Sequence, residues 1–129
     1  MNAEQELKDT ALQLATLMEE KQAEDVMVLD ISPQNPFFKY FILATGQSFV
    51  QLRGLADYVQ QHAKKEGLAL SSTWSKQAED PWVLLDYGDI VVHIFLPETR
   101  EYYNLEKVYY EAEIILNHKG QSPAYAKES

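Results

Sequence analysis

Hydrophobic and polar residues alternate along this chain with two periods, and each period predicts one type of element. Four apolar residues near the N-terminus recur at helical spacing between polar residues: Leu7, Ala11, Leu14 and Met18. This spacing predicts an amphipathic helix over about residues 3–22. The apolar, branched segment Val26–Ile31 predicts a strand, and Ser32–Pro36, with its prolines and asparagine, predicts a loop. Lys39–Thr45 predicts a second strand, which ends at Gly46.

The period then becomes helical again over residues 48–67. The apolar residues that share one face are Phe49, Leu52, Leu55, Ala56, Val59 and Ala63. Ser48 precedes the run and Gln51 follows three residues later, which is the capping-box pattern of a helix N-terminus. Gly67 predicts the end of this helix.

The second half of the chain predicts three more strands and a last helix. Residues 68–74 alternate between apolar and polar and predict a third strand. Trp82–Phe95 holds two apolar runs joined by Asp-Tyr-Gly-Asp, which predicts a hairpin because Gly88 can supply a positive φ at its tip. Residues 105–119 show helical spacing and predict the last helix, with Asn104 as its cap.

This order of elements predicts one α/β domain over residues 1–118. A chain of 129 residues is typical of a single domain. The order helix, strand, strand, helix, strand, strand, strand, helix favours a mixed sheet of about five strands with helices mainly on one face. The other face of the sheet would then be free to meet a partner. Residues 119–129 predict a flexible C-terminal tail.

Charge narrows the class of partner. The chain carries 11 Lys and Arg against 20 Asp and Glu, which gives a formal net charge of −9. Because surfaces that bind nucleic acid are usually basic, we expect no direct recognition of nucleic acid. A basic protein partner fits the charge better, since complementary fields speed encounter. Plain solubility is the alternative interpretation of the same charge.

Composition and the N-terminus also bear on the cellular compartment. The chain has no cysteine, which excludes disulfides, thiolate metal sites and a cysteine nucleophile. Its N-terminal segment MNAEQELKDT is polar and lacks the apolar core of a signal peptide. No apolar run approaches the roughly 20 residues of a membrane span. We therefore expect a soluble, cytoplasmic protein.

The hairpin carries the candidate chemical groups Asp86, Asp89 and His93. Carboxylates and imidazole bind metals and move protons. Alternation along the strand places Asp89 and His93 on one face, but about 13 Å apart, which is too far for one metal ion. We expect both aspartates to cap the tight turn through backbone N–H groups, and a binding role is the alternative.

The segment TGQS, Thr45–Ser48, raises the possibility of a phosphate site, because it lies between a strand and a helix. It has one glycine and no following lysine, so it matches neither a Walker A motif nor a dinucleotide fingerprint. Asp86 is followed by Tyr87 and Gly88, so the Asp-x-Asp pair of a nucleotidyltransferase is missing. We expect a helix cap here, and no catalytic residue, metal or cofactor.

The surface of the hairpin is a candidate binding site instead. Trp82, Leu84 and Asp86 share one face of their strand. The carboxylates of Glu79, Asp80, Asp86 and Asp89 crowd this region without a cation among them. An aromatic side chain surrounded by acids is typical of an interface hot spot for a basic partner. The alternative is a core tryptophan with a solvated acidic rim.

Three segments together resemble a known family: YFILATGQS at residues 40–48, WVLLDYGDIVVHIF at 82–95, and Arg100 followed by YNLE at 103–106. The positions that make the pattern specific are Trp82, Asp86, Gly88, Asp89, His93, Phe95, Arg100, Tyr103, Leu105 and Glu106. This pattern resembles the ribosomal silencing factor (RsfS, or Iojap) family, and the resemblance runs from about residue 3 to 117.

The resemblance implies a nucleotidyltransferase-like topology without catalysis. Members of the family bind the large ribosomal subunit through large-subunit ribosomal protein fourteen, a small basic protein at the subunit interface. There they sterically block joining of the small subunit and repress translation when nutrients are short. They often form homodimers. The missing Asp-x-Asp pair and the acidic net charge agree with this expectation.

Carried over position by position, the resemblance implies a partner-binding surface and a supporting network. The partner-binding residues are Trp82, Leu84, Asp86, Tyr87, Gly88 and Asp89. The supporting residues are His93, Arg100, Tyr103 and Glu106. We expect a buried network that joins the last strand to the last helix, with Arg100 paired with Asp89 or Glu106 and His93 hydrogen-bonded beside them.

The chain departs from the family pattern at two places. Lys39 stands where the family usually has aspartate, and Ser75-Lys76 where it usually has Glu-Gly. Both changes move charge toward positive near the expected contact surface. Two other classes of function stay open at this point: a nucleotide-binding or nucleotidyl-transferring enzyme on the same fold, and a ribosome-assembly or scaffold protein.

Overall fold

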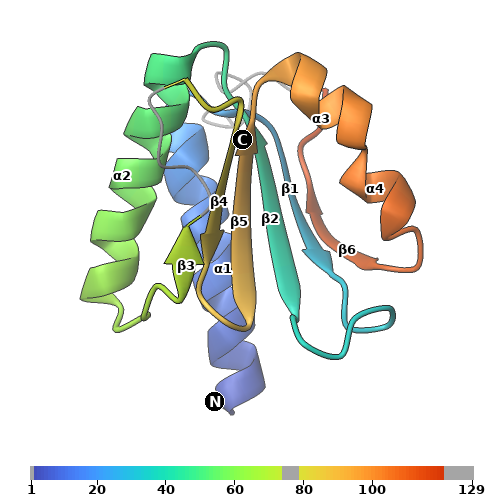
Figure 1. Cartoon of the computed structure of the whole chain (residues 1–129). Coiled ribbons are helices and arrows are strands. Elements are labelled where there is room, and N and C mark those ends of the chain that lie inside the picture. Colours follow the sequence, from blue (N-terminus) through green and yellow to red (C-terminus); the bar gives the residue numbers. More distant parts are fainter. Residues whose placement is uncertain (1, 74–78, 121–129) are drawn as a thin grey trace.

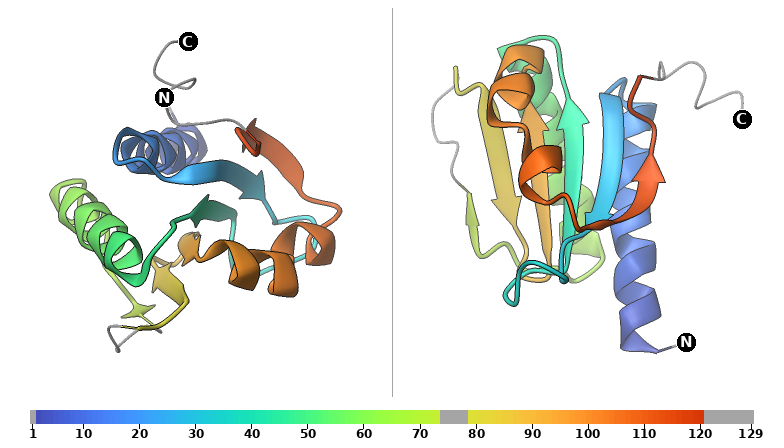
Figure 2. Two further views of the ribbon diagram at one scale, coloured as in Figure 1. Left: turned by 90° about the horizontal axis from the view of Figure 1, so that it is seen from above. Right: turned by 90° about the vertical axis from the view of Figure 1, so that its right-hand side faces the viewer.

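One twisted sheet lies between two layers of helices (Figures 1 and 2). The computed structural model describes residues 2–73 and 79–120. Two long helices, α1 (Ala3–Glu20) and α2 (Phe49–Lys65), cover one face of the sheet. Two short helices, α3 (Pro97–Tyr103) and α4 (Leu105–Val108), lie on the opposite face. The sheet is therefore covered on both faces, which separates two apolar layers.

Within the described residues, the sheet has six strands in the order β3-β4-β5-β2-β1-β6. Their bounds are β1 Glu24–Asp30, β2 Tyr40–Thr45, β3 Ser72–Thr73, β4 Trp82–Asp86, β5 Ile90–Phe95 and β6 Glu113–Asn117. The two central strands, β2 and β5, run parallel, and the other neighbours are antiparallel. Every residue of β2 and β5 is buried, as expected for strands with covered faces.

The predicted α/β class with a mixed sheet is confirmed, but the strand count and the last helix are not as predicted. Residues 113–117, placed by periodicity in a helix, form β6 on the outer edge of β1. The apolar run Ile114–Leu116 is too short for its period to separate helix from strand. The free edge of β1 supplies the hydrogen-bond partner, so the tertiary context decides the element.

Two further expectations about the sheet are corrected. The predicted strand over residues 68–74 reduces to the two residues of β3, and Trp74 lies outside the described residues. The face predicted to be free carries α3 and α4, because the chain breaks at Asn104 into two short helices that fold over it. Only part of that face is thus open to a partner.

Side chains alternate along the hairpin as predicted, and because both faces of the sheet are covered, this alternation divides the core into two layers. Ile90, Val92 and Ile94 face α1 and α2 in the larger apolar cluster. Val91 and Phe95 face the opposite way, with Leu84 from β4, in the smaller cluster under α3 and α4. Hydrophobic burial on both faces fixes the register of the hairpin, because a slip of one residue would exchange the two faces.

The predicted helix cap in the TGQS segment is confirmed. The Ser48 side chain accepts a hydrogen bond from the backbone N–H of Gln51 at 3.1 Å. The Gln51 side chain in turn accepts a hydrogen bond from the backbone N–H of Gln47 at 2.7 Å. The serine oxygen that a phosphate site would need is therefore occupied at the N-terminus of α2.

The end of the described chain packs against α1 and β1. The backbone N–H of His118 donates to the carbonyl of Val26, and the backbone N–H of Gly120 donates to Oδ1 of Asp25. Nδ1 of His118 lies 2.5 Å from a carboxylate oxygen of Glu19. Lys119 and Gly120, which the sequence assigns to the tail, thus contact the domain, and residues 121–129 lie outside the described residues.

Candidate partner-binding surface

Trp82 begins β4 and is held from three sides on the face that carries α3 and α4. Its ring centroid lies 5.0 Å from that of Phe95 and 4.9 Å from that of Tyr103. Its indole Nε1–H donates a hydrogen bond to Nδ1 of His93 at 3.2 Å. A partly exposed tryptophan with a fixed orientation suits an interface, because little conformational entropy is lost on binding.

His93 positions this tryptophan from inside the sheet. The imidazole is 3% exposed and lies against the rings of Phe41 and Phe95. Burial lowers the pKa of His93 to about 3, so the ring is neutral at physiological pH. Since Nδ1 accepts from Trp82, the proton is assigned to Nε2, which has no hydrogen-bond partner among the described residues. His93 is expected from the sequence to be hydrogen-bonded beside Arg100. Its observed hydrogen bond is instead to Trp82.

Two tyrosines of α3 extend the surface outward. Tyr103 packs on Trp82, and Tyr102 meets Tyr103 edge-to-face with ring centroids 5.0 Å apart. Tyr102 is 81% exposed and Tyr103 is 50% exposed, so Tyr103, expected among the supporting residues, lies on the surface instead. We call Trp82, Tyr102 and Tyr103 the aromatic surface. Neighbouring aromatic side chains in partial contact with solvent are the composition that protein interfaces favour.

The tip of the hairpin lies away from the aromatic surface. Oδ1 of Asp86 accepts the backbone N–H of Gly88 at 2.8 Å, and Gly88 has the positive φ predicted for the turn. The carbonyl of Asp89 accepts the backbone N–H groups of Lys39 and Tyr40. Of the two aspartates predicted to cap the turn, Asp86 does so with its side chain, whereas Asp89 uses its backbone carbonyl and ties the tip to the start of β2. Because Asp86 ends β4 and Trp82 begins it, the two stand at opposite ends of the strand.

Leu84 and Tyr87, expected at or near the partner surface, are buried. Leu84 lies in the apolar cluster beneath α3 and α4, and Tyr87 lies in the cluster beneath α1 and α2. Burial raises the pKa of Tyr87 to about 12, and its hydroxyl has no hydrogen-bond partner within the described part of the chain. Both side chains support the hairpin from within and offer no exposed contact.

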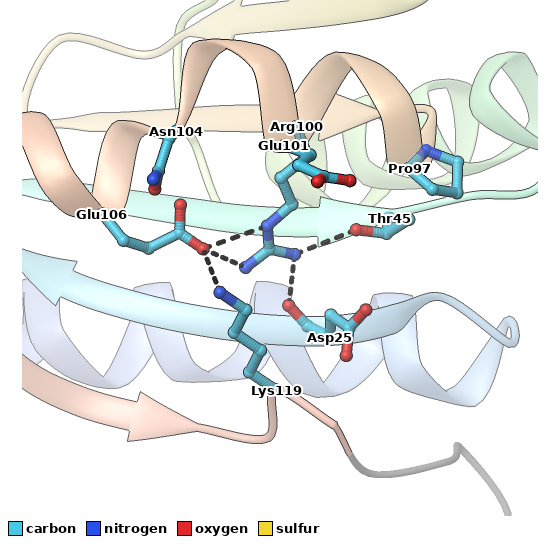
Figure 3. A pocket seen from close by; sticks show the side chains of 8 residues that line it. All are labelled: Asp25, Thr45, Pro97, Arg100, Glu101, Asn104, Glu106 and Lys119. Carbon is cyan, nitrogen blue, oxygen red and sulfur yellow. Dashed lines mark hydrogen bonds and ion pairs between the residues drawn. The ribbon is translucent and has the colours of Figure 1, made fainter.

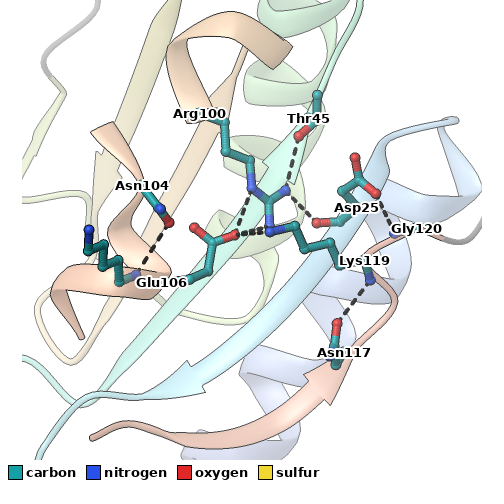
Figure 4. Close-up of polar contacts among 9 residues, drawn as sticks. Asp25, Thr45, Arg100, Asn104, Glu106, Asn117, Lys119 and Gly120 are labelled. Carbon is teal, nitrogen blue, oxygen red and sulfur yellow. Dashed lines mark hydrogen bonds and ion pairs between the residues drawn. The ribbon is translucent and has the colours of Figure 1, made fainter. Parts of the chain in front are cut away.

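Arg100 joins segments that are distant in sequence (Figure 4). It lies on α3 and is 6% exposed. Its Nε and Nη2 donate to the same carboxylate oxygen of Glu106 at 3.2 and 3.0 Å. Its Nη1 donates to Oγ1 of Thr45 at 3.0 Å and to the carbonyl of Asp25. Of the two expected partners, Glu106 is therefore the one observed.

The Arg100 network fixes α3 and α4 to the end of the sheet. Burial alone would raise the pKa of Glu106, but a backbone hydrogen bond and the charge of Arg100 outweigh it and lower that pKa. Glu106 is thus ionised at neutral pH and pairs with the guanidinium. Lys119, just after β6, adds its ammonium 3.5 Å from Glu106. The network consequently holds the helix that carries Tyr102 and Tyr103.

A pocket of about 360 Å³ opens beside this network, and we call it the Arg100 pocket (Figure 3). It is lined by Asp25, Thr45, Pro97, Arg100, Glu101, Asn104, Glu106 and Lys119. No group of three or more histidine, aspartate or glutamate side chains suited to a metal ion occurs among the described residues. In the same part of the chain, no helix has the length and apolar character needed to cross a bilayer.

Comparison with known proteins assigns the family. The family described as "Ribosomal silencing factor during starvation" (RsfS) matches residues 4–129. The chain belongs to the RsfS family. The ribosomal silencing factor of Chromobacterium violaceum is 34% identical over 109 residues, which cover 84% of this chain and 81% of that protein. The ribosomal silencing factor of Bacillus subtilis is 35% identical over 98 residues, which cover 76% and 82%.

A solved structure shows the same fold. The crystal structure of a Chromobacterium violaceum protein superposes with a TM-score of 0.72 at 31% identity, and the match covers 93% of this chain and 98% of that one. The RsfS relatives are named as regulatory factors of the ribosome, which agrees with a role in the regulation of translation rather than with a named enzymatic activity.

Lys39, where this chain departs from the RsfS pattern, uses its charge internally. Its ammonium lies 2.9 Å from Oδ2 of Asp30 and 3.6 Å from a carboxylate oxygen of Glu4. The hydrogen bond to Asp30 raises the pKa of Lys39. Burial would raise the pKa of Asp30, but hydrogen bonds from Ser32 and Lys39 lower it. The second departure, Ser75-Lys76, lies outside the described residues.

Sequence reasoning missed part of this RsfS site. Thr45 and Asp25, both partners of Arg100, come from β2 and β1, and nothing in the local pattern links them to α3. Tyr102 has a local signal in the sequence, because it stands beside Tyr103 directly before Asn104, where α3 ends. The sequence shows the two adjacent aromatic residues, and the structure shows that both are exposed, a composition that protein interfaces favour.

Proposed function

We propose that this protein acts as a ribosomal silencing factor that binds large-subunit ribosomal protein fourteen on the large ribosomal subunit. The observation that carries this proposal is the aromatic surface, which stands fixed and partly exposed on a chain with a net charge of −9. Membership of the RsfS family supports it, as do relatives that are named ribosomal silencing factors. An aromatic anchor with an acidic field suits a small basic protein.

The contact would have a centre and a secondary region. Trp82, with Tyr102 and Tyr103, forms the centre. The tip of the hairpin, with Asp86, Gly88 and Asp89, lies at the other end of β4 and supplies acidic contacts at the rim. Leu84 and Tyr87 hold the hairpin rigid from within, while His93, Arg100 and Glu106 fix Trp82 and α3 in place.

The mechanism is steric, and no covalent step is involved. A protein bound to large-subunit ribosomal protein fourteen occupies a surface that the small subunit needs, so the subunits cannot join and translation is repressed. The protein acts in the cytoplasm, where ribosomes assemble on messenger RNA. It recognises protein rather than nucleic acid, as its acidic charge favours. It forms homodimers, a proposal supported by the resemblance to a family in which homodimers are common.

Co-sedimentation with ribosomal subunits tests the proposal. Purified large subunits are mixed with the protein, sedimented, and then challenged with small subunits. We expect the protein to sediment with large subunits and to prevent joining. Tyr102→Ala should weaken both effects, whereas Tyr110→Ala, which removes a similarly exposed tyrosine outside the aromatic surface, should weaken neither.

Two results would contradict the proposal. Binding to large subunits with undisturbed joining would indicate a ribosome-assembly or scaffold protein. Absence of binding would instead favour a nucleotide-binding enzyme. Titration with nucleotide and magnesium would test that alternative. The engagement of Ser48 as a helix cap argues against that enzyme.

A further inference from the structure

The Arg100 pocket lies where an open α/β sheet is suited to hold a ligand. β2 leads into α2 on one face of the sheet, and the parallel neighbour β5 leads into α3 on the opposite face. Ligands of such sheets bind in the crevice outside the carboxyl ends of the strands, at the point where the connections diverge. Thr45 at the end of β2 and Pro97 after β5 both line the pocket.

The charges of the pocket favour a cationic group. Three carboxylates, from Asp25, Glu101 and Glu106, face two cations, Arg100 and Lys119. Arg100 is buried and directs its hydrogen bonds to groups of its own chain, so its charge is neutralised by Glu106. Glu101 is exposed and has no ion-pair or hydrogen-bond partner within the described ranges. Its carboxylate is free to receive a cation.

Lys119 already places an ammonium group in this pocket. Figure 3 shows its side chain reaching toward Glu106, and the two charged groups lie 3.5 Å apart. The Lys119 side chain is nevertheless 56% exposed, so water and salt screen the pair. A second basic side chain can therefore replace Lys119 without a large loss of stability.

The pocket and the aromatic surface are served by the same helix. Tyr103 of α3 packs on Trp82 at the β4 side, while Arg100 of α3 points to β1 and the segment after β6. A partner that covers α3 would meet aromatic side chains on one side and the Arg100 pocket on the other.

We infer that the Arg100 pocket binds a lysine or arginine side chain of the basic ribosomal partner, which takes the place of Lys119. This inference rests on the proposed function for the identity of the partner. The pocket supplies a specific polar contact, and the aromatic surface supplies most of the apolar contact area. Glu101 and Glu106 are the carboxylates that receive the incoming cation.

Matched variants test the inference in the complex. Isolated large-subunit ribosomal protein fourteen is titrated calorimetrically into each variant. Glu101→Gln should weaken binding about three- to five-fold, because it removes the unpaired carboxylate of the pocket. Glu98→Gln, which removes the same charge from the first turn of α3, should change it less than two-fold. Equal effects of the two variants would overturn the inference.

Removal of the Lys119 charge should change the affinity for the ribosomal protein in the opposite direction. Lys119→Met keeps the aliphatic stem but removes the internal ammonium, so it should tighten binding about two- to three-fold. Lys107→Met removes an exposed lysine of α4 that does not line the pocket, and it reports the effect of net charge alone. If Lys119→Met is no tighter than Lys107→Met, Lys119 does not compete with the partner.

A probe that is independent of the ribosome separates failure of this inference from failure of the proposed function. Trilysine is titrated while the NMR signals of the Arg100 Nε–H and the Gly120 amide are followed. We expect saturable shifts that Glu101→Gln abolishes. Shifts without binding of the ribosomal protein would overturn only the proposed function. If the ribosomal protein binds but trilysine causes no shifts and Glu101→Gln has no effect, only the inference about the pocket is overturned. If the ribosomal protein does not bind and trilysine causes no shifts, the proposed function and the inference are both overturned.

Discussion

His93 is a buried histidine whose neutral form the fold requires. Unfolded histidine binds a proton near pH 6.5, whereas the buried ring resists protonation until about pH 3. Between these values the unfolded state binds more protons, so the free energy of unfolding should fall as pH drops through this window. This group alone should cost about 2 kcal/mol between pH 7 and pH 5. Urea unfolding monitored across that range measures the loss.

His93→Gln is the control for this pH dependence. A glutamine oxygen can still accept the indole N–H of Trp82, but the side chain does not titrate. The variant should lose stability less steeply between pH 7 and pH 5 than the wild type. If the free energy of unfolding falls equally with pH in the two proteins, groups other than His93 cause the decline in stability.

Arg100 and Glu106 form a mostly buried ion pair, and breaking it should be costly. Arg100→Met leaves Glu106 and Thr45 without their donor, so we expect a loss of about 3 kcal/mol in the free energy of unfolding at pH 7. The double variant Arg100→Met, Glu106→Leu removes both charges and should recover part of that loss. Glu106→Leu alone completes the set, and chemical denaturation of the wild type, the two single variants and the double variant forms a double-mutant cycle. A double variant as unstable as the sum of the single changes would show that the charges are not coupled.

Trp82 is the tryptophan of the aromatic surface and packs on Tyr103, and its removal should weaken binding of the ribosomal partner. Trp82→Ala should cost about 2 kcal/mol or more, a roughly 30-fold loss of affinity. Circular dichroism and thermal unfolding confirm that the variant is folded before calorimetry with large-subunit ribosomal protein fourteen. An unchanged affinity in the folded variant would remove Trp82 from the interface.

Among the secondary-structure elements, the junction of α3 and α4 depends on a single residue, Asn104. Asn104 has a left-handed backbone with φ of 42°, and its side chain caps α4 by accepting the backbone N–H of Lys107. Asn104→Ala loses the cap and strains the backbone, so it should lower the free energy of unfolding by about 1–2 kcal/mol. Asn104→Gly loses only the cap and should cost less, because glycine tolerates this φ. Urea unfolding compares them, and equal losses would show that the backbone is not strained.

Most elements could be predicted because their own sequence determines them. The capping residues of α2 and the alternation in the hairpin are local signals, and both appear as predicted. The segment 105–119 failed because its outcome depends on a distant strand. Asn104 breaks the helix after α3, and residues 113–117 find a hydrogen-bonding partner in β1, which lies more than eighty residues earlier. Periodicity within the segment contains no information about that partner.

The candidate site could be predicted only as a set of residues and not as an arrangement. The pattern singled out Trp82, Arg100 and Glu106, and the structure brings Arg100 and Glu106 together. It separates Trp82 from the hairpin tip, because the length of β4 lies between them. It also buries Tyr87, since side chains on adjacent positions point to opposite faces. Such distances come from the whole fold, which a linear pattern does not specify.

The charge of the whole molecule leads to a prediction about the rate of association. A net charge of −9 should attract a basic ribosomal protein over distances longer than any single contact. Raising the salt from 50 to 500 mM should therefore lower the association rate constant about ten-fold or more, and change the dissociation rate constant much less. Stopped-flow fluorescence with labelled large-subunit ribosomal protein fourteen measures both constants.

Trp82→Ala provides the matched control for that experiment. It removes an apolar contact and no charge, so it should raise the dissociation rate constant and leave the salt dependence of association intact. The two experiments together assign the roles: net charge would govern the encounter, and the aromatic surface would govern the lifetime of the complex. An association rate constant that is independent of salt would contradict electrostatic steering. Such a result would leave shape and apolar contact at the aromatic surface as the basis of recognition.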